Sequence, residues 1–170
     1  YEDHAWIAPY EDFLLRSRDA DKPIGGICFG HQIMAQAFGG AVAKSDRGWA
    51  IGRKTHRVTA EGRSHVSDLD QIASLSFHQD QVTRVPPGAQ VVLGNDHSPH
   101  GGLAYSFAAL SVQFHPEFAP AYVASLLDGP GFETIPPTVI EDCRMSLDQA
   151  LDNAAVAGAF ARLYRRHIRD

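Results

Sequence analysis

A cysteine flanked by glycines is the side chain in this 170-residue sequence whose setting points most directly to chemistry. Gly26-Ile27-Cys28-Phe29-Gly30 has the spacing G-x-C-x-G, which is the nucleophile-elbow pattern with cysteine in place of serine. In an elbow the nucleophile lies on a strained turn between a strand and a helix, where larger neighbouring side chains would collide with both elements. The pattern therefore favours a nucleophilic Cys28 over an inert buried cysteine.

The same corner predicts how the thiol is activated. If a helix begins directly after Cys28, its N-terminal dipole favours an anion and lowers the thiol pKa from its ordinary value of about 8.5. The backbone N–H of Phe29, the residue after the nucleophile, can then point toward an oxyanion formed in the reaction. We therefore expect a reactive thiolate, with Phe29 as one oxyanion donor.

A nucleophilic thiol needs a base, and the base needs a group that orients it. His115-Pro116-Glu117 offers both at the end of a predicted strand. Side chains at positions i and i+2 share one face of a strand, so Glu117 is placed to hold and polarise His115. Pro116 lacks an N–H group and suits the end of a strand better than its middle. Taken alone, the pair is also consistent with an exposed loop histidine beside an unrelated glutamate.

The elements that must position these groups follow from hydrophobic periodicity. An apolar strand is predicted from Ile24 to Cys28, and the helix that begins at His31 stops at Gly39-Gly40. Further strands are predicted at Ala41–Lys44, Trp49–Thr59, Ile72–His78 and Gln90–Gly94, with a hairpin formed by Leu103–Phe107 and Leu110–Phe114. Helices are predicted from Trp6 to about Asp19, at Pro120–Leu127, and in a tail over Thr138–Asp170 that breaks near Asn153 or Gly158. Gly129-Pro130-Gly131 with Pro136-Pro137 is predicted as a hinge before that tail.

Composition bounds the classes of function. With 44% hydrophobic and 21% charged residues, the chain suits one globular domain of ordinary size. A net charge of −5 argues against a nucleic-acid partner, and no apolar run or signal peptide indicates a membrane. The two cysteines, Cys28 and Cys143, lack the spacing of a disulfide framework, which favours a reducing compartment and a cytoplasmic location.

Two polar segments invite comparison with metal sites, but neither has a ligand set of known spacing. Asn95–His100 has the composition of a surface loop, and His78 with Asp80 is better explained as a polar strand end. We therefore expect no metal ligands, and the chemistry of a cysteine nucleophile requires no cofactor.

Three segments carry a resemblance to a known family. "GICFGHQ" (26–32) looks like the nucleophile signature of the class I (triad) glutamine amidotransferases, and "VQFHPEF" (112–118) looks like their His-Glu signature. "FHQDQV" (77–82) is similar to a substrate-side segment of their GMP-synthase-like and stand-alone members. The match spans about residues 1–128 in consistent order, so the chain resembles a stand-alone GMP-synthase-like member of this family.

The resemblance implies an α/β fold. It consists of a flavodoxin-like, open and mostly parallel sheet flanked by helices, with an added β-hairpin region and a C-terminal helical tail. Residues 1–128 would form the amidotransferase-like domain, and 129–170 a linker and helical tail packed on the same domain. Family members carry further strands and a glycine-bearing loop before the first helix seen here. We expect these N-terminal strands to be missing from this chain, so the second oxyanion donor, which that loop supplies, is not assigned.

The resemblance also implies a reaction. Cys28 would attack the side-chain amide carbon of glutamine, ammonia would leave, and water would release glutamate from a γ-glutamyl thioester. In this scheme His115 moves the protons and Glu117 keeps it in the productive tautomer, which completes a Cys-His-Glu triad. The residues expected to bind the substrate are Gln32, His78, Gln79 and Asp80.

Three functions remain open from the sequence. The first is a glutaminase that passes ammonia to a separate acceptor synthase. The second is a γ-glutamyl hydrolase or peptidase, which would use the same triad on a substrate with a larger amine leaving group. The third is a non-catalytic binding protein that uses the fold as a scaffold, and the intact triad argues against it.

Overall fold

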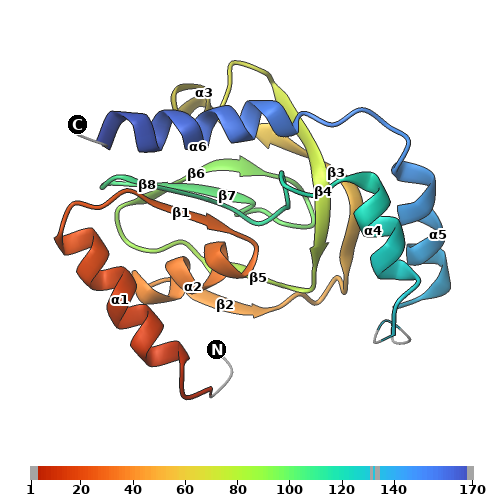
Figure 1. Cartoon of the computed structure of the whole chain (residues 1–170), viewed down its shortest axis with the longest axis horizontal. Coiled ribbons are helices and arrows are strands. Elements are labelled where there is room, and N and C mark those ends of the chain that lie inside the picture. Colours follow the sequence, from red (N-terminus) through yellow and green to blue (C-terminus); the bar gives the residue numbers. More distant parts are fainter. Residues whose placement is uncertain (1–3, 131, 133–134, 168–170) are drawn as a thin grey trace.

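A β-sheet with helices packed against it dominates the computed structural model in Figure 1, which describes residues 4–130, 132 and 135–167. The helices are α1 (Ile7–Asp19), α2 (Phe29–Ala37), α3 (Ala60–His65), α4 (Pro120–Leu127), α5 (Pro137–Ser146) and α6 (Asn153–His167). The strands are β1 (Ile24–Ile27), β2 (Ala41–Lys44), β3 (Ala50–Val58), β4 (Gln71–His78), β5 (Asp80–Arg84), β6 (Ala89–Gly94), β7 (Gly102–Tyr105) and β8 (Ala109–Val112). Gly131 of the predicted hinge and residues 168–170 of the predicted tail lie outside the described residues, as do residues 1–3.

The main sheet has the strand order β1-β8-β7-β6-β3-β4, and β2 pairs with β5 in a separate two-stranded sheet. The α/β class and the flanking helices are confirmed. The sheet is mixed, however, because β1 and β8 pair in parallel whereas the other neighbours in the main sheet pair antiparallel. The expected mostly parallel sheet therefore does not form. Strands β6, β7 and β8 follow one another through short connections, and a short connection can join only antiparallel neighbours.

Alternate side chains of β7 enter two different cores, as the period of two in a strand requires. Leu103 and Tyr105 pack with residues of α1 and α2, such as Leu14 and Ile33. Ala104 instead belongs to a second core that includes residues of α6. Helices α1 and α2 thus cover one face of the sheet and α6 covers the other, and β7 is buried on both faces.

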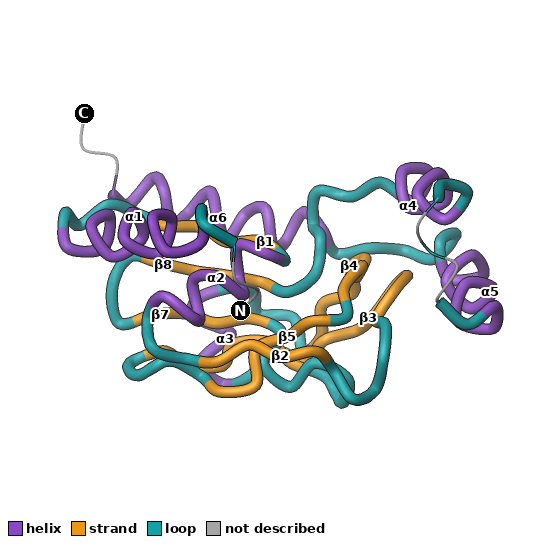
Figure 2. The backbone as a smooth tube through the Cα atoms, turned by 90° about the horizontal axis from the view of Figure 1, so that it is seen from below, coloured by secondary structure: helices purple, strands orange, loops and turns teal. Residues whose placement is uncertain are grey.

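The third core lies where β3 and β4 project beyond the rest of the sheet. Figure 2 shows α4 and α5 grouped at this end of the molecule. Ile51 of β3 and Leu75 of β4 pack there against Val123 of α4 and Cys143 of α5. The predicted helix at Pro120–Leu127 is confirmed, and so is a break near Asn153, where α6 begins. No helix among the described residues is both long and apolar enough to cross a bilayer.

Candidate active site

Cys28 lies on a strained corner between β1 and α2. Its φ of 50° is in the left-handed region, which a residue with a Cβ rarely occupies. Hydrogen bonds on both sides hold this backbone, because the Cys28 N–H donates to the Val112 carbonyl at 2.9 Å and the Cys28 carbonyl accepts from the Gln32 N–H at 3.1 Å. The strand, corner and helix predicted from the glycine-flanked cysteine are therefore all present.

The two glycines of the motif differ in their structural roles. A Cβ on Gly26 would lie 2.8 Å from the backbone carbonyl of Gly30 and 2.4 Å from Sδ of Met34, so only glycine lets the strand approach the helix so closely. A Cβ on Gly30 would meet no atom of the described residues within 4 Å. The expectation that both glycines avoid a collision therefore holds for Gly26 alone, because position 30 faces the open hollow between α1 and α2.

The thiol is less acidic than its place at a helix N-terminus predicts. Burial raises the pKa of Cys28 to about 11, and the negative charges of Glu117 and Asp80 also raise it. The backbone N–H of Phe29 acts in the opposite direction, as the elbow predicts, but its effect is smaller than that of burial. Loss of hydration outweighs the helix terminus, so the resting side chain is a protonated thiol that requires a base.

His115 and Glu117 form the hydrogen-bonded pair that their spacing predicts. The Nδ1–H of His115 donates to Oε1 of Glu117 at 2.6 Å, which leaves Nε2 as the basic nitrogen of the neutral ring. Strand β8 ends at Val112, two residues short of the predicted Phe114, yet the backbone is still held, since the His115 N–H donates to the Leu75 carbonyl at 2.7 Å.

Packing further fixes the imidazole of His115. The ring of Phe118 stacks on it with centroids 3.8 Å apart and an interplanar angle of 10°. The ring of Tyr122 in α4 makes an edge-on contact with Phe118 at a centroid distance of 4.8 Å. These contacts leave the His115 side chain 12% exposed, whereas the Glu117 side chain is 46% exposed.

Parallel pairing brings the thiol and the histidine to one edge of the sheet. Ile27 is the register partner of Val112, so Cys28 and Gln113 each follow directly on neighbouring strands. His115 lies two residues beyond Gln113. Because the carboxyl ends of parallel strands meet at the same edge, the predicted nucleophile and base converge although they are 87 positions apart in the sequence.

Gln113 is a contact of the thiol that sequence reasoning missed. This side chain is 1% exposed, and its Nε2 donates to Sγ of Cys28 at 3.8 Å. Its Oε1 accepts from Nε2 of Gln32 at 3.2 Å, and the same Gln32 amide donates to the backbone carbonyl of Asp80 at 2.7 Å. The available signal was a polar residue between two apolar neighbours, Val112 and Phe114, at the end of a buried strand.

The residues expected to bind the substrate lie around this chain of hydrogen bonds. Gln32 is 3% exposed and His78 is 4% exposed, and Nδ1 of His78 donates to the same Asp80 carbonyl at 3.1 Å. Gln79 and Asp80 are half-buried, and the Gln79 carbonyl accepts from the Ser45 N–H at 2.9 Å. The structure thus joins Gln32, His78 and Asp80 beside the thiol, and substrate binding by these residues stays a prediction.

Three histidines, His78 and two whose electrostatic interaction reaches it, are buried. His31, His56 and His78 are each less than 5% exposed, and burial lowers their pKa values to about 3, 4 and 3 respectively. Nδ1 of His31 is hydrogen bonded to Oγ of Ser111 at 2.8 Å. Within residues 4–130, 132 and 135–167, no three His, Cys, Asp or Glu side chains are arranged to hold a metal ion.

Comparison with known proteins decides the family. Residues 8–123 match the model of the family described as "Glutamine amidotransferase class-I", which is more than half of the chain. The chain belongs to the class-I glutamine amidotransferases. All four residues that the elbow and its base bring together, Cys28, Phe29, His115 and Glu117, lie within the matched range.

Individual relatives of this class-I glutamine amidotransferase are named for different activities. "Gamma-glutamyl peptidase 5" from Arabidopsis thaliana is 28% identical over 133 residues, which cover 75% of this chain and 53% of that protein. A glutamine-hydrolyzing GMP synthase subunit from Methanopyrus kandleri is 34% identical over 110 residues, covering 61% of this chain and 56% of that protein. The chain therefore spans about half the length of these curated relatives.

A solved structure supports the fold of this chain. A glutamine amidotransferase from Methylobacillus flagellatus superimposes with a TM-score of 0.79 at 19% identity, over 99% of this chain and 73% of that one. At this identity the likeness concerns the fold alone. The mixed sheet with helices on both faces is thus an arrangement found in a solved member of the family.

Proposed function

We propose that this class-I glutamine amidotransferase hydrolyses the side-chain amide of glutamine to glutamate and ammonia through Cys28, His115 and Glu117. One observation supports this most: the strained cysteine and the hydrogen-bonded His115–Glu117 pair follow adjacent parallel strands, β1 and β8. A nucleophile, a base and a group that orients the base then share one edge of the sheet.

The first half of the reaction forms a thioester. Nε2 of His115 takes the proton of the Cys28 thiol as the sulfur attacks the amide carbon of glutamine. The oxygen of that amide becomes an oxyanion and accepts a hydrogen bond from the Phe29 N–H. The protonated His115 gives its proton to the amide nitrogen, the C–N bond breaks, and ammonia leaves with the γ-glutamyl group bound to sulfur.

The second half restores the enzyme. His115 takes a proton from water as the water oxygen attacks the thioester carbon, and the returned proton goes to sulfur when the C–S bond breaks. Glutamate and the free thiol are the products. Glu117 accepts the Nδ1–H of His115 throughout and stabilises the imidazolium that forms twice in each cycle.

The raised thiol pKa fits this sequence of proton transfers. Because the resting thiol is protonated, the thiolate forms only when His115 is in place to receive the proton and to pair with the sulfur as an imidazolium. The rigid setting of His115 between Phe118 and Glu117 keeps it available for that transfer. In this proposal the protein needs no metal or organic cofactor.

A γ-glutamyl peptidase activity is the second candidate, favoured by the similarity to the Arabidopsis thaliana protein of that name. The same thioester would form, with an amine larger than ammonia as the leaving group. If the enzyme is instead a glutaminase, we propose that ammonia passes to a separate synthase, as the name of the Methanopyrus kandleri relative suggests.

Turnover assays separate these candidates. The full-length protein is incubated with glutamine and, separately, with γ-glutamyl peptides, and ammonia and glutamate are measured. Release of ammonia from glutamine supports the glutaminase, and turnover of peptides alone supports the peptidase. If neither substrate is turned over and Cys28 does not react with an electrophile, a non-catalytic binding role replaces both proposals.

The two cysteines of the chain provide a matched pair of variants. We expect Cys28→Ala to abolish turnover while the melting temperature changes little, because the thiol is the nucleophile and not part of a core cluster. Cys143→Ala, which removes the other thiol from the core beneath α5, is expected to retain turnover. Activity in Cys28→Ala would refute the assignment of the nucleophile.

A further inference from the structure

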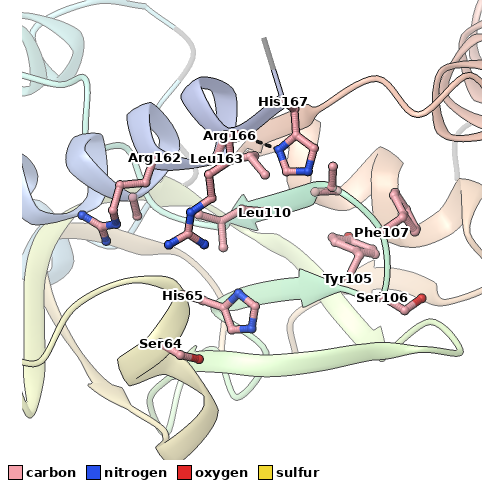
Figure 3. Close-up of a pocket in the computed structure, with 13 residues that line it drawn as sticks. Ser64, His65, Tyr105, Ser106, Phe107, Leu110, Arg162, Leu163, Arg166 and His167 are labelled. Carbon is pink, nitrogen blue, oxygen red and sulfur yellow. Dashed lines mark hydrogen bonds between the residues drawn. The ribbon is translucent and has the colours of Figure 1, made fainter. Parts of the chain in front are cut away.

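A hollow of about 390 Å³ lies at the opposite end of β8 from the candidate active site. Ala109, the first residue of β8, lines it, whereas Val112, the last, contacts the backbone of Cys28. Helix α6 forms one wall, and α3 and the connection from β7 to β8 form the others (Figure 3). This volume falls in the range of pockets that bind small molecules.

The wall formed by α6 is strongly basic. Arg162 and Arg166 are one helical turn apart, and Figure 3 shows both side chains directed from α6 toward α3, where His65 lies. His167 completes the set at the end of α6. None of the lining residues, all of which belong to the described part of the chain, is Asp or Glu. The hollow is thus a cationic region on a chain whose net charge is −5.

The two guanidinium groups retain most of their donors. Arg162 of α6 donates from one terminal nitrogen to the carbonyl of Val66, the residue after α3, at 2.6 Å. This hydrogen bond holds the side chain between α3 and α6. A guanidinium carries five N–H donors, so the remaining ones of Arg162 are available to a ligand. Arg166 forms no ion pair with any described residue, whereas the nearby Arg63 is neutralised by Asp70.

Hydroxyl and imidazole groups surround the same space. Ser64 and Ser106 line the hollow from two sides, and the Ser64 hydroxyl donates to the Glu61 carbonyl at 2.9 Å. Nδ1 of His167 donates to the Leu163 carbonyl at 2.8 Å, which orients its ring. The floor is apolar and includes Leu110 and Phe107. Such a site offers two planar guanidinium groups and the Ser106 hydroxyl as donors, above an apolar surface that suits a hydrocarbon or sugar ring.

From this arrangement we infer that the hollow binds the phosphate group of a small phosphorylated molecule. A carboxylate has only two oxygens and would leave several of these donors without an acceptor, whereas a phosphate monoester presents three strong acceptor oxygens and nearly two negative charges. The apolar floor would contact the organic part of the molecule. This site is separate from the thiol and does not depend on the proposed glutamine hydrolysis.

Calorimetric titration tests the inference, with inorganic phosphate and pyrophosphate as probes and no glutamine present. We expect saturable binding of pyrophosphate to the unmodified protein. Arg166→Gln is expected to weaken it at least about tenfold, because the variant loses the positive charge and the charged hydrogen bonds of the guanidinium. Arg165→Gln is the matched control, since Arg165 is exposed on the same turn of α6 and does not line the hollow.

Three results would overturn the inference. One is the absence of saturable binding by either probe, and another is an equal loss of affinity in Arg165→Gln, which would indicate a general charge effect. The third is binding of acetate as tight as that of phosphate, which would exclude a phosphate-specific site. Each variant is compared by thermal melting, and because Arg166 is exposed, the fold is expected to remain intact.

Discussion

Acidification should destabilise this protein strongly because three of its histidines are buried as neutral rings. His31, His56 and His78 have pKa values lowered by burial to about 3, 4 and 3, whereas each titrates near 6.5 once the chain unfolds. Below about pH 6.5 the unfolded chain therefore binds protons that the folded chain does not. The folded state therefore has its full stability above pH 6.5, the pKa of histidine in the unfolded chain. This stability is lost as the pH falls from about 6.5 toward the folded pKa values of about 3 to 4.

The size of the effect follows from proton linkage. One unit of pKa corresponds to about 1.4 kcal/mol, so each histidine loses about 2 kcal/mol of folding free energy between about pH 7.5 and pH 5. The three together lose about 6 kcal/mol, and near pH 5 the slope is about 4 kcal/mol per pH unit. Because a typical domain is stable by only about 5–15 kcal/mol, acid unfolding is expected near this pH.

Urea unfolding at a series of pH values measures this slope. His56→Gln removes one of the three titrating rings, and we expect its slope to be smaller by about 1.4 kcal/mol per pH unit. If that variant does not fold, His31→Gln serves the same purpose. His65→Gln, at an exposed position, is the control for a histidine substitution that leaves the three buried rings in place. Equal slopes for the unmodified protein and for His56→Gln would refute this reasoning, because the two proteins differ only in the side chain at position 56.

Two further substitutions test contacts described above. Gln113→Leu removes the hydrogen bond to Sγ of Cys28, so we expect kcat for glutamine to fall about tenfold. A kcat equal to that of the unmodified protein would show that this contact does not position the thiol. Gly52→Ala puts a Cβ at φ 79° and 2.9 Å from Cα of Cys143, so the free energy of unfolding in urea should fall by roughly 2 kcal/mol. An unchanged urea midpoint for Gly52→Ala would contradict this prediction, because it would mean that α5 can move away from β3 without lowering the free energy of unfolding.

Local signals explain why the candidate site could be predicted from the sequence. The strand, the corner at Cys28 and the helix after it depend on an apolar run and on glycine positions, which are properties of neighbouring residues. The His115–Glu117 contact likewise follows from a spacing of two residues in extended backbone. Their convergence required the resemblance to a family, because the pairing of β1 with β8 is a property of the whole fold.

Elements stabilised by distant partners were missed. β5 (Asp80–Arg84) was not predicted, and it pairs with β2 in the small sheet, outside the main one. The short helix α3 lacks an apolar stripe, although a capping signal was present, since the Thr59 hydroxyl accepts from the Gly62 N–H at 3.0 Å. The direction of most strands in the main sheet was predicted wrongly as parallel, because hydrophobic alternation does not distinguish parallel from antiparallel pairing and the expectation came from the family resemblance.

Quantities that depend on packing could not be predicted either. The pKa of Cys28 reflects burial that no motif encodes, and it moved in the direction opposite to the one expected from the helix terminus. The same holds for Gly30, whose open surroundings depend on where α1 lies. A sequence motif predicts which side chains lie together, whereas burial by the surrounding side chains sets their pKa values and therefore their protonation states.

The left-handed backbone at Cys28 implies a conflict between activity and stability at this one residue. A residue with a Cβ is disfavoured at φ 50°, and glycine would relieve roughly 1 kcal/mol of strain there. Replacement of Cys28 by glycine would therefore give a more stable protein that has lost its proposed nucleophile. Selection for stability alone would remove the thiol, so its presence in so unfavourable a conformation supports the catalytic role that we propose for its sulfur.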